Sequence, residues 1–385
     1  MTISFNFKQI AMIFIAVTLA GITFGITMPL STLTLKSWGI GSAMIGFSAA
    51  MPAIATVLIT PFLPKLINYF GQVITIRFCL VLEAACILCL PFFPNITSWL
   101  FLRFLIGVGA TGIWLMSEIW INGYADDKNR GKIIAIYSSL LSAGFIIGVL
   151  LVSIIDIKES NIAFYVAAGI VAMAAIPMWN ITPLSLDNMG EDIAFWDHLF
   201  SEPGLMGSSW MMGFLYAATA SLLPVFALQF DLNYAQSSRT VAWLGSGELM
   251  LPLLVGWLAD RMNKRKLMIY ISLLTIAMLL LLPFIFSSAL LRLAVLFVLG
   301  GAIMSFYSLG LTMLGQQFKG SLLASANASF IFFLCLGEIF GPPVIGASMD
   351  FFGNENDYAF GWTMALISII YLLVFISLGR KARPN

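Results

Sequence analysis

The sequence has 385 residues, of which 60% are hydrophobic and only 10% are Asp, Glu, Lys or Arg, and its mean hydropathy is +0.98. Such a chain has too few polar side chains to cover a water-soluble surface, so its main solvent is the lipid bilayer. The formal net charge of +1 gives no reason to expect a nucleic-acid partner.

Apolar runs of about 20 residues, the length of a membrane-crossing helix, recur along the chain. The first run is longer than the core of a signal peptide, so we expect a retained span. The pattern predicts an all-α membrane protein with twelve transmembrane helices. The predicted spans lie near 10–33, 41–63, 73–94, 98–122, 132–155, 162–181, 205–229, 236–258, 266–287, 290–315, 322–348 and 359–379.

A polar, acidic stretch divides these spans into two sets of six. The predicted organisation is an N-terminal six-helix bundle over 1–181, a cytoplasmic linker over 182–204 and a C-terminal six-helix bundle over 205–385.

Lysine and arginine are distributed unequally between the two sets of predicted loops. With both termini inside, fourteen fall on the cytoplasmic side and four outside, namely Lys36, Lys158, Arg239 and Arg292, while Arg103 lies within a span. Because positive side chains favour the cytoplasmic side, this bias predicts cytoplasmic termini in a multi-pass protein of a bacterial inner membrane.

Glycines recur at a constant shift between the two halves, which indicates two homologous six-helix units. The shift is 193 residues. The pairs that share it are Gly107 and Gly300, Gly144 and Gly337, and Gly148 and Gly341.

Three motifs resemble those of the major facilitator superfamily. "GWLADRMNKR" (256–265) resembles the family's loop signature, "RFLIGVG" (103–109) its fourth-span signature, and "GEIFGPPVIG" (337–346) its Gly-Pro signature, although the antiporters of the family carry that last motif in span 5. The resemblance covers nearly the whole chain. It implies two pseudo-symmetric six-helix bundles around a cavity lined by spans 1, 4, 7 and 10.

In this family the loop signature holds the cytoplasmic helix ends together. The loop between spans 8 and 9 keeps the Asp–Arg pair, whereas the loop between spans 2 and 3 has Asn68 and Tyr69 instead. We therefore expect an asymmetric gate that is charged in the second half only. The predicted gating residues are Gly71, Gly256, Asp260 and Arg261.

Charged side chains inside the spans are the main candidates for function, because each costs about 2.5–3.5 kcal/mol at the bilayer centre by insertion scales. At 100° per residue, Arg103, Gly107, Thr111, Trp114 and Glu118 fall on one stripe of span 4. This stripe predicts the wall of a polar cavity. The alternative is that Arg103 braces helix ends and Glu118 meets the adjoining loop.

Other spans contribute further candidates for a substrate or proton pathway. A carboxyl group on spans 8 or 11 is expected to carry a proton or to be paired, and one of Glu118, Glu248 and Glu338 is expected to couple proton movement to transport. Glu83 in span 3 is expected to be structural. The remaining candidates are Tyr216 in span 7 and Ser305 and Ser308 in span 10.

Small residues and proline predict close helix approach and a bend in span 11. The predicted packing residues are Gly107, Gly144, Gly148, Gly337, Gly341 and Pro342.

The sequence lacks the patterns of an enzyme. Its one histidine is His198, the four cysteines lie in apolar runs, and no phosphate-binding GxxxxGK[ST] motif is present. We therefore expect no cofactor and no metal. The expected function is secondary transport of a small organic solute by a monomer, proton-coupled, with efflux and uptake both open. The alternative is a sensor or channel of transporter-like fold.

Overall fold

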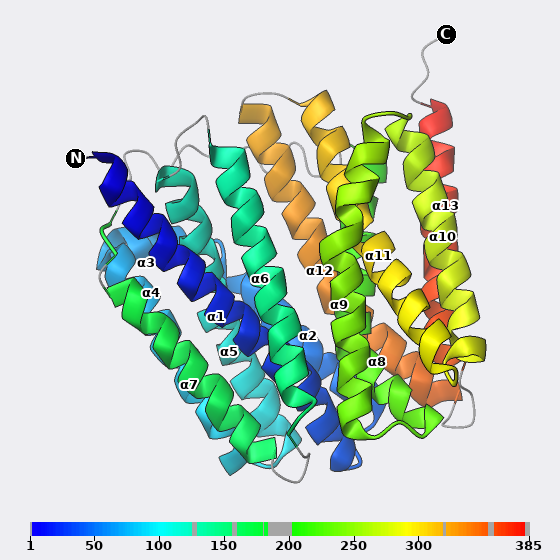
Figure 1. Cartoon of the computed structure of the whole chain (residues 1–385), viewed down its shortest axis with the longest axis horizontal. Helices are drawn as coiled ribbons and strands as arrows, with labels where there is room; N and C mark the ends of the chain where they lie inside the picture. The colour runs from blue at the N-terminus through cyan, green and yellow to red at the C-terminus, as the bar shows by residue number, and fades with distance from the viewer. Residues whose placement is uncertain are drawn as a thin grey trace. The chain divides into compact units, whose positions relative to one another are not determined.

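The structure of the chain is a computed structural model, described over residues 2–124, 129–155, 160–179, 181–183, 202–318, 321–352 and 358–381. Twelve helices within these residues are long and apolar enough to cross a membrane, which confirms the predicted spans. They are α1 (Thr2–Ser37), α2 (Ser42–Ile59), α4 (Gln72–Cys89), α5 (Ile96–Tyr124), α6 (Arg130–Val152), α7 (Ser160–Trp179), α8 (Pro203–Ala227), α9 (Tyr234–Ala259), α10 (Lys264–Ile285), α11 (Ala289–Gln317), α12 (Ser321–Phe352) and α13 (Ala359–Lys381) (Figure 1).

Polar residues inside these helices are satisfied largely by their own backbone. In lipid every polar group must find a partner within the protein, and a helical Ser or Thr can donate to the carbonyl one turn earlier. Thr275 donates to the Ile271 carbonyl at 2.9 Å, and Ser272 to that of Met268 at 2.8 Å. Hydroxyl groups can thus be buried in apolar spans at little cost.

The chain forms two compact units, one of residues 1–35 and 51–189 and the other of 36–50 and 190–385. Helix α2 contributes its first turns to the second unit and the rest to the first. The predicted linker over 182–204 lies mostly outside the described residues, so the predicted domain boundaries stay a prediction.

In the first unit, glycines bring α1 and α6 into backbone contact. A Cβ atom at Gly144 would lie 2.4 Å from the Thr18 carbonyl oxygen, and one at Gly148 would lie 2.1 Å from that of Ile22. No side chain fits in such a space. The two helices therefore cross at glycine positions of α6, because the absence of a side chain lets the two backbones touch.

The second unit repeats this crossing between α8 and α12. A Cβ atom at Gly337 would lie 2.1 Å from the Trp210 carbonyl oxygen, and one at Gly341 would lie 2.3 Å from that of Phe214. Trp210 and Phe214 each stand 192 residues after the corresponding residue of α1. The repeat predicted from glycine spacing is thus a repeat of helix contacts, while α12 runs as one helix through Pro342.

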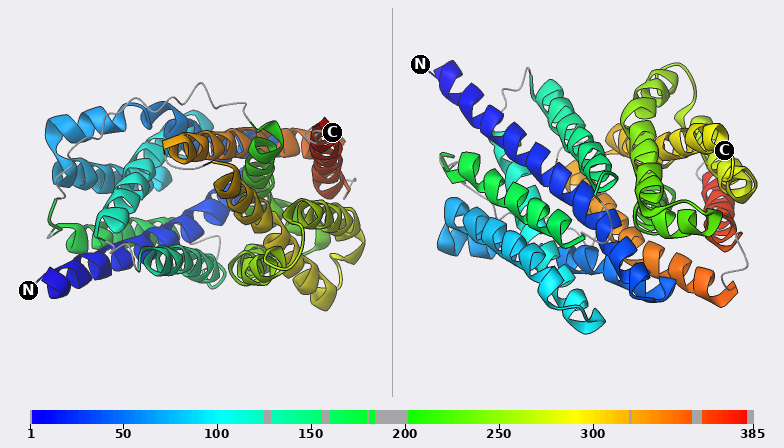
Figure 2. Two further views of the ribbon diagram at one scale, coloured as in Figure 1. Left: turned by 90° about the horizontal axis from the view of Figure 1, so that it is seen from above. Right: turned by 60° about the horizontal axis from the view of Figure 1, so that its bottom comes forward.

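Two helix pairs account for much of the packing in the second unit. Helix α8 packs against α12, and α9 against α11, over much of their lengths (Figure 2). Nearly all of α8 is buried. At its end Phe226 lies 4.9 Å from Phe286 and 4.7 Å from Phe360 between ring centroids, which forms a compact aromatic cluster.

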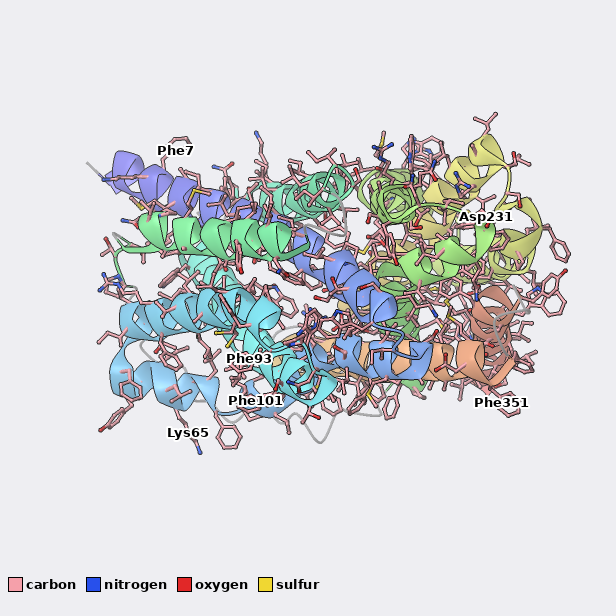
Figure 3. All side chains as sticks on the ribbon, turned by 90° about the horizontal axis from the view of Figure 1, so that it is seen from below. Phe7, Lys65, Phe93, Phe101, Asp231 and Phe351 are labelled. Carbon is pink, nitrogen blue, oxygen red and sulfur yellow. The ribbon has the colours of Figure 1, made fainter. Side chains whose placement is uncertain are left out.

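The outer faces of the helices carry large apolar side chains. Phe101 is 63% exposed and Phe351 84% exposed, and both point away from the helices (Figure 3). In water such side chains would be unfavourable, but they suit contact with lipid.

Among the described residues, three short helices were not predicted from the sequence: α3 (Leu63–Phe70), η1 (Leu90–Phe92) and η4 (Leu228–Phe230). Helix α3 buries Leu63 and Ile67 and exposes Tyr69. Gly71 ends it with φ +82°, a conformation that favours glycine. This backbone conformation explains why position 71 is a glycine, independently of the gating role predicted for it.

Candidate functional site

Three residues named from the sequence come together in the second unit. The phenol of Tyr216 on α8 lies within electrostatic range of both Glu248 on α9 and Glu338 on α12. All three side chains are half-buried. Two carboxyl groups and a phenol from three different helices thus form one polar cluster inside an apolar bundle.

Both glutamates lie beside glycines at close helix crossings, Glu338 at the crossing of α12 with α8 and Glu248 at that of α9 with α11. A Cβ atom at Gly213 would lie 3.2 Å from the Glu338 backbone nitrogen, and Tyr216 stands three residues further along α8. Gly247, just before Glu248, fits against the Phe297 carbonyl oxygen of α11, where a Cβ atom would lie 1.8 Å away. Each glutamate therefore follows a glycine at a close helix crossing. The dipeptide Gly-Glu, which occurs at both positions, is a sequence signal from which the two glutamates could have been grouped as one candidate site.

The carboxyl group of Glu248 is incompletely satisfied. Its Oε1 atom is buried and has no hydrogen-bond partner. Buried polar atoms nearly always have a partner, so an exception calls for an explanation. A proton, a cation or a donor group of a bound solute would satisfy this oxygen.

The serines of α11 direct their hydroxyl protons into their own helix. Ser305 is fully buried and donates to the Gly301 carbonyl at 2.6 Å, and Ser308 donates to that of Met304 at 3.2 Å. Their oxygens can still accept a hydrogen bond. The predicted role of these serines in a pathway stays a prediction.

The predicted stripe of α5 has two kinds of environment. Gly107 faces α2, where a Cβ atom would lie 2.5 Å from the Pro52 Cα, and the buried Thr111 hydroxyl shares a 2.7 Å hydrogen bond with that of Thr56. Both residues therefore pack this helix pair together. Arg103 is also buried, with 4% of its surface exposed.

The other end of the stripe carries a second polar group. The Trp114 indole, 38% exposed, donates a hydrogen bond to the half-buried Glu118. Tyr137 of α6 lies within electrostatic range of the same carboxyl group. The sequence analysis did not identify Tyr137, because only the fold brings α6 beside this part of α5.

The loop that resembles the family signature joins α9 to α10. The Arg261 guanidinium lies 3.8 Å from the ring centroid of Trp257 and donates to the carbonyl of that residue at 3.2 Å. Arg265 donates to the Phe375 carbonyl at 2.7 Å and so ties α10 to α13. A Cβ atom at Gly256 would meet no other atom within 4 Å. The predicted gating role of Asp260 stays a prediction.

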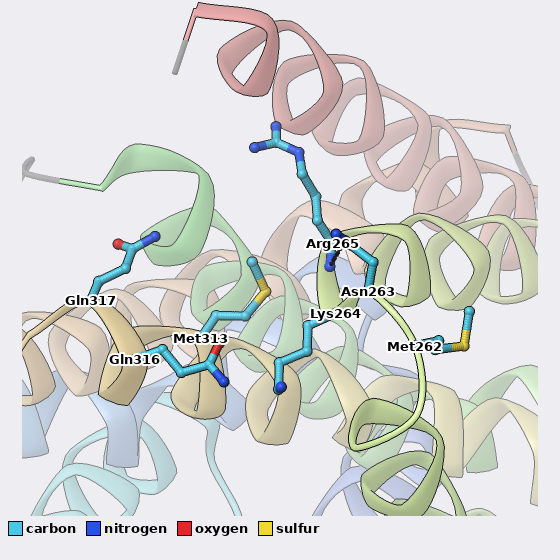
Figure 4. A pocket seen from close by; sticks show the side chains of 7 residues that line it. All are labelled: Met262, Asn263, Lys264, Arg265, Met313, Gln316 and Gln317. Carbon is cyan, nitrogen blue, oxygen red and sulfur yellow. Dashed lines mark hydrogen bonds between the residues drawn. The ribbon is translucent and has the colours of Figure 1, made fainter. Parts of the chain in front are cut away.

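A cavity of about 340 Å³ opens beside this loop, at the ends of α9, α10 and α11 (Figure 4). It contains none of the buried carboxyl groups. Its lining residues are Met262, Asn263, Lys264, Arg265, Met313, Gln316 and Gln317.

The described residues contain no group of three His, Cys, Asp or Glu side chains placed to hold a metal ion. Cys79 and Cys86 lie one turn on either side of Glu83 on α4, and the Cβ of Glu83 packs against Gly109 of α5. This buried carboxyl group thus lies at a tight helix crossing.

The sequence profile of the Major Facilitator Superfamily matches residues 13–247 and, in a second match, residues 205–385. The chain belongs to this superfamily. The family predicted from the three motifs is thereby confirmed.

Relatives of this chain are named as transporters. The chain is 24% identical over 372 residues to the MFS-type transporter YfkF of Bacillus subtilis (strain 168), and the match covers 93% of each chain. It is also 24% identical over 299 residues to the MFS-type transporter YcaD of Escherichia coli (strain K12 / DH10B), covering 74% of each chain.

Solved structures of the superfamily share its fold. The nucleoside transporter NupG superposes with a TM-score of 0.80 at 15% identity, over 97% of this chain and 98% of that one. A D-xylose–proton symporter gives a TM-score of 0.76 at 14% identity, over 94% and 97%. These likenesses confirm the predicted fold of two pseudo-symmetric six-helix bundles in an integral multi-pass membrane protein.

Proposed function

We propose that the chain is a proton-coupled secondary transporter that moves a small organic solute by alternating access. The observation that supports this most strongly is the cluster of Tyr216, Glu248 and Glu338. An ionised carboxylate in the bilayer interior is costly, so each carboxyl group is most stable with a proton or a cationic partner. A site that binds and releases a proton as its access changes can couple proton flow to solute flow.

The proposal covers uptake and efflux alike. The lysine and arginine distribution supports cytoplasmic termini in a bacterial inner membrane. Because each chain carries both repeats, we propose that a monomer is the working unit.

Proton movement in proteoliposomes tests the proposal. The purified protein is reconstituted with a pH-sensitive dye inside the vesicles, and a library of nucleosides, sugars, amino acids and cationic drugs is added. We expect one class of solute to change the internal pH in a saturable manner. Glu338→Gln or Glu248→Gln should lower this proton flux at least tenfold while solute-for-solute exchange persists.

The matched control is Glu83→Gln, which removes a buried carboxyl group outside the cluster and should leave proton coupling unchanged. Proton flux that needs no solute and does not saturate would indicate a channel. Solute binding without any flux would indicate a sensor, which is the alternative function.

A further inference from the structure

The start of α2 is capped by a carboxylate from a distant part of the chain. Asp350, near the end of α12, accepts hydrogen bonds from the backbone N–H of Ser42 and of Ala43, each at 2.8 Å and each to a different oxygen. The residue before this helix is Gly41, which has no side chain to serve as a cap. The free N–H groups and the positive end of the helix dipole are thus satisfied by a residue more than 300 positions away.

Near this cap the backbones of α2 and α12 are in close contact at two glycines. A Cβ atom at Gly46 would lie 2.1 Å from the Pro342 carbonyl oxygen, and one at Gly346 would lie 2.1 Å from that of Ser42. A side chain is excluded at both points, so the backbones of α2 and α12 touch there. At these two positions no side chain has to be withdrawn for the helices to separate.

The boundary between the two compact units falls just after this contact. Residues 36–50 belong to the same unit as α12, and the other unit resumes at Met51. Pro52 follows, and a proline within a helix cannot donate the backbone hydrogen bond of a regular turn. The capped turns of α2 are therefore joined to the rest of the helix at a weakened point.

We propose that Asp350 is a releasable cap that holds the first turns of α2 on α12 and stabilises closure of the outer end of the transporter. The proposal rests on the proposed function, in which the outer end opens once in each cycle, and on the proposed orientation. Asp350 is exposed to solvent, so water can replace both hydrogen bonds when the cap is released. Such a bond biases a conformational equilibrium without locking it.

Distance measurements between spin labels at the outer helix ends test the cap. The labels are placed at Asn161 on α7 and Leu290 on α11, both exposed, in a full-length variant whose four native cysteines are replaced by alanine. We expect Asp350→Asn to raise the ratio of long to short distances about tenfold, because the charge and one of the two hydrogen bonds are lost.

Asp231→Asn is the matched control, since it removes an exposed carboxylate beyond the end of α8 and should leave the ratio unchanged. Gly346→Ala should act as Asp350→Asn does, by forcing a methyl group against the Ser42 carbonyl. Two populations whose ratio is the same in the wild type and both cap variants would overturn the cap and leave the proposed function intact. One population in every variant, with or without solute, would overturn both.

Discussion

Asn263 stands where the family's loop signature has glycine, and the structure gives it a defined role. Its side-chain oxygen accepts hydrogen bonds from the backbone N–H of Arg265 at 3.0 Å and of Lys266 at 3.2 Å, so it caps α10. Asparagine is among the best residues at this position because it satisfies N–H groups that have no partner in the helix. The departure from the motif is therefore a local gain in stability.

Replacing this cap should destabilise the protein. We expect Asn263→Ala to lower the free energy of unfolding by about 1 kcal/mol, as loss of an N-cap side chain usually does. Thermal unfolding in detergent measures the effect, and Asn233→Ala, which removes the capping box of α9, is the comparison. A melting temperature lowered by Asn233→Ala but not by Asn263→Ala would show that the Asn263 cap contributes nothing.

At the scale of helices, glycine determines which pairs touch. The α1–α6 and α8–α12 crossings both depend on glycines that face a backbone carbonyl. The glycines of the two crossings are 193 residues apart in the chain, and the carbonyls that they face are 192 residues apart. Gly256 differs, since a Cβ atom there would meet nothing within 4 Å. The same residue type thus serves close packing in one place and lies in open space in another.

Alanine substitutions should separate these two situations. Gly337→Ala forces a methyl group onto the Trp210 carbonyl and is expected to cost about 1–3 kcal/mol, the usual range for overpacking. Gly256→Ala adds no contact and should be neutral or stabilise α9 by about 0.5–1 kcal/mol. Unfolding of both variants in detergent gives the comparison, and equal destabilisation would contradict the packing role of Gly337.

At the scale of the whole molecule, the twelve membrane-spanning helices found in the described residues need an orientation, and the loop charges predict one. Lys and Arg outside the spans are concentrated in one set of loops, whereas the other set holds only Lys36, Lys158, Arg239 and Arg292. This asymmetry favours cytoplasmic termini because positive loops resist translocation.

A reporter fused to the C-terminus tests this orientation. We expect a green fluorescent protein fusion at Asn385 to be fluorescent in a bacterial host and an alkaline phosphatase fusion at the same point to be inactive. As a control, the same reporters inserted after Asp231 should give the opposite pattern. Active phosphatase at Asn385 would reverse the predicted topology.

Much of the fold follows from the sequence, because a bilayer requires long apolar helices and tolerates little else. The grouping of side chains does not follow in the same way. Tyr216 and Glu338 were each candidates, but only the crossing at Gly213 shows that they are neighbours. The Asp350 cap joins residues too distant for any periodicity to relate. Helix α3 was not predicted because its eight residues are too few for a span.

The hydrogen bond between Trp114 and Glu118 has an optical consequence. Indole emission responds to a nearby charge, so a change in the protonation or pairing of Glu118 would alter the fluorescence of this tryptophan. The chain contains ten tryptophans, and the difference between the wild type and Trp114→Phe isolates the signal of this one. We therefore expect the emission of Trp114 to report events at the Glu118 carboxyl group in real time without an added dye.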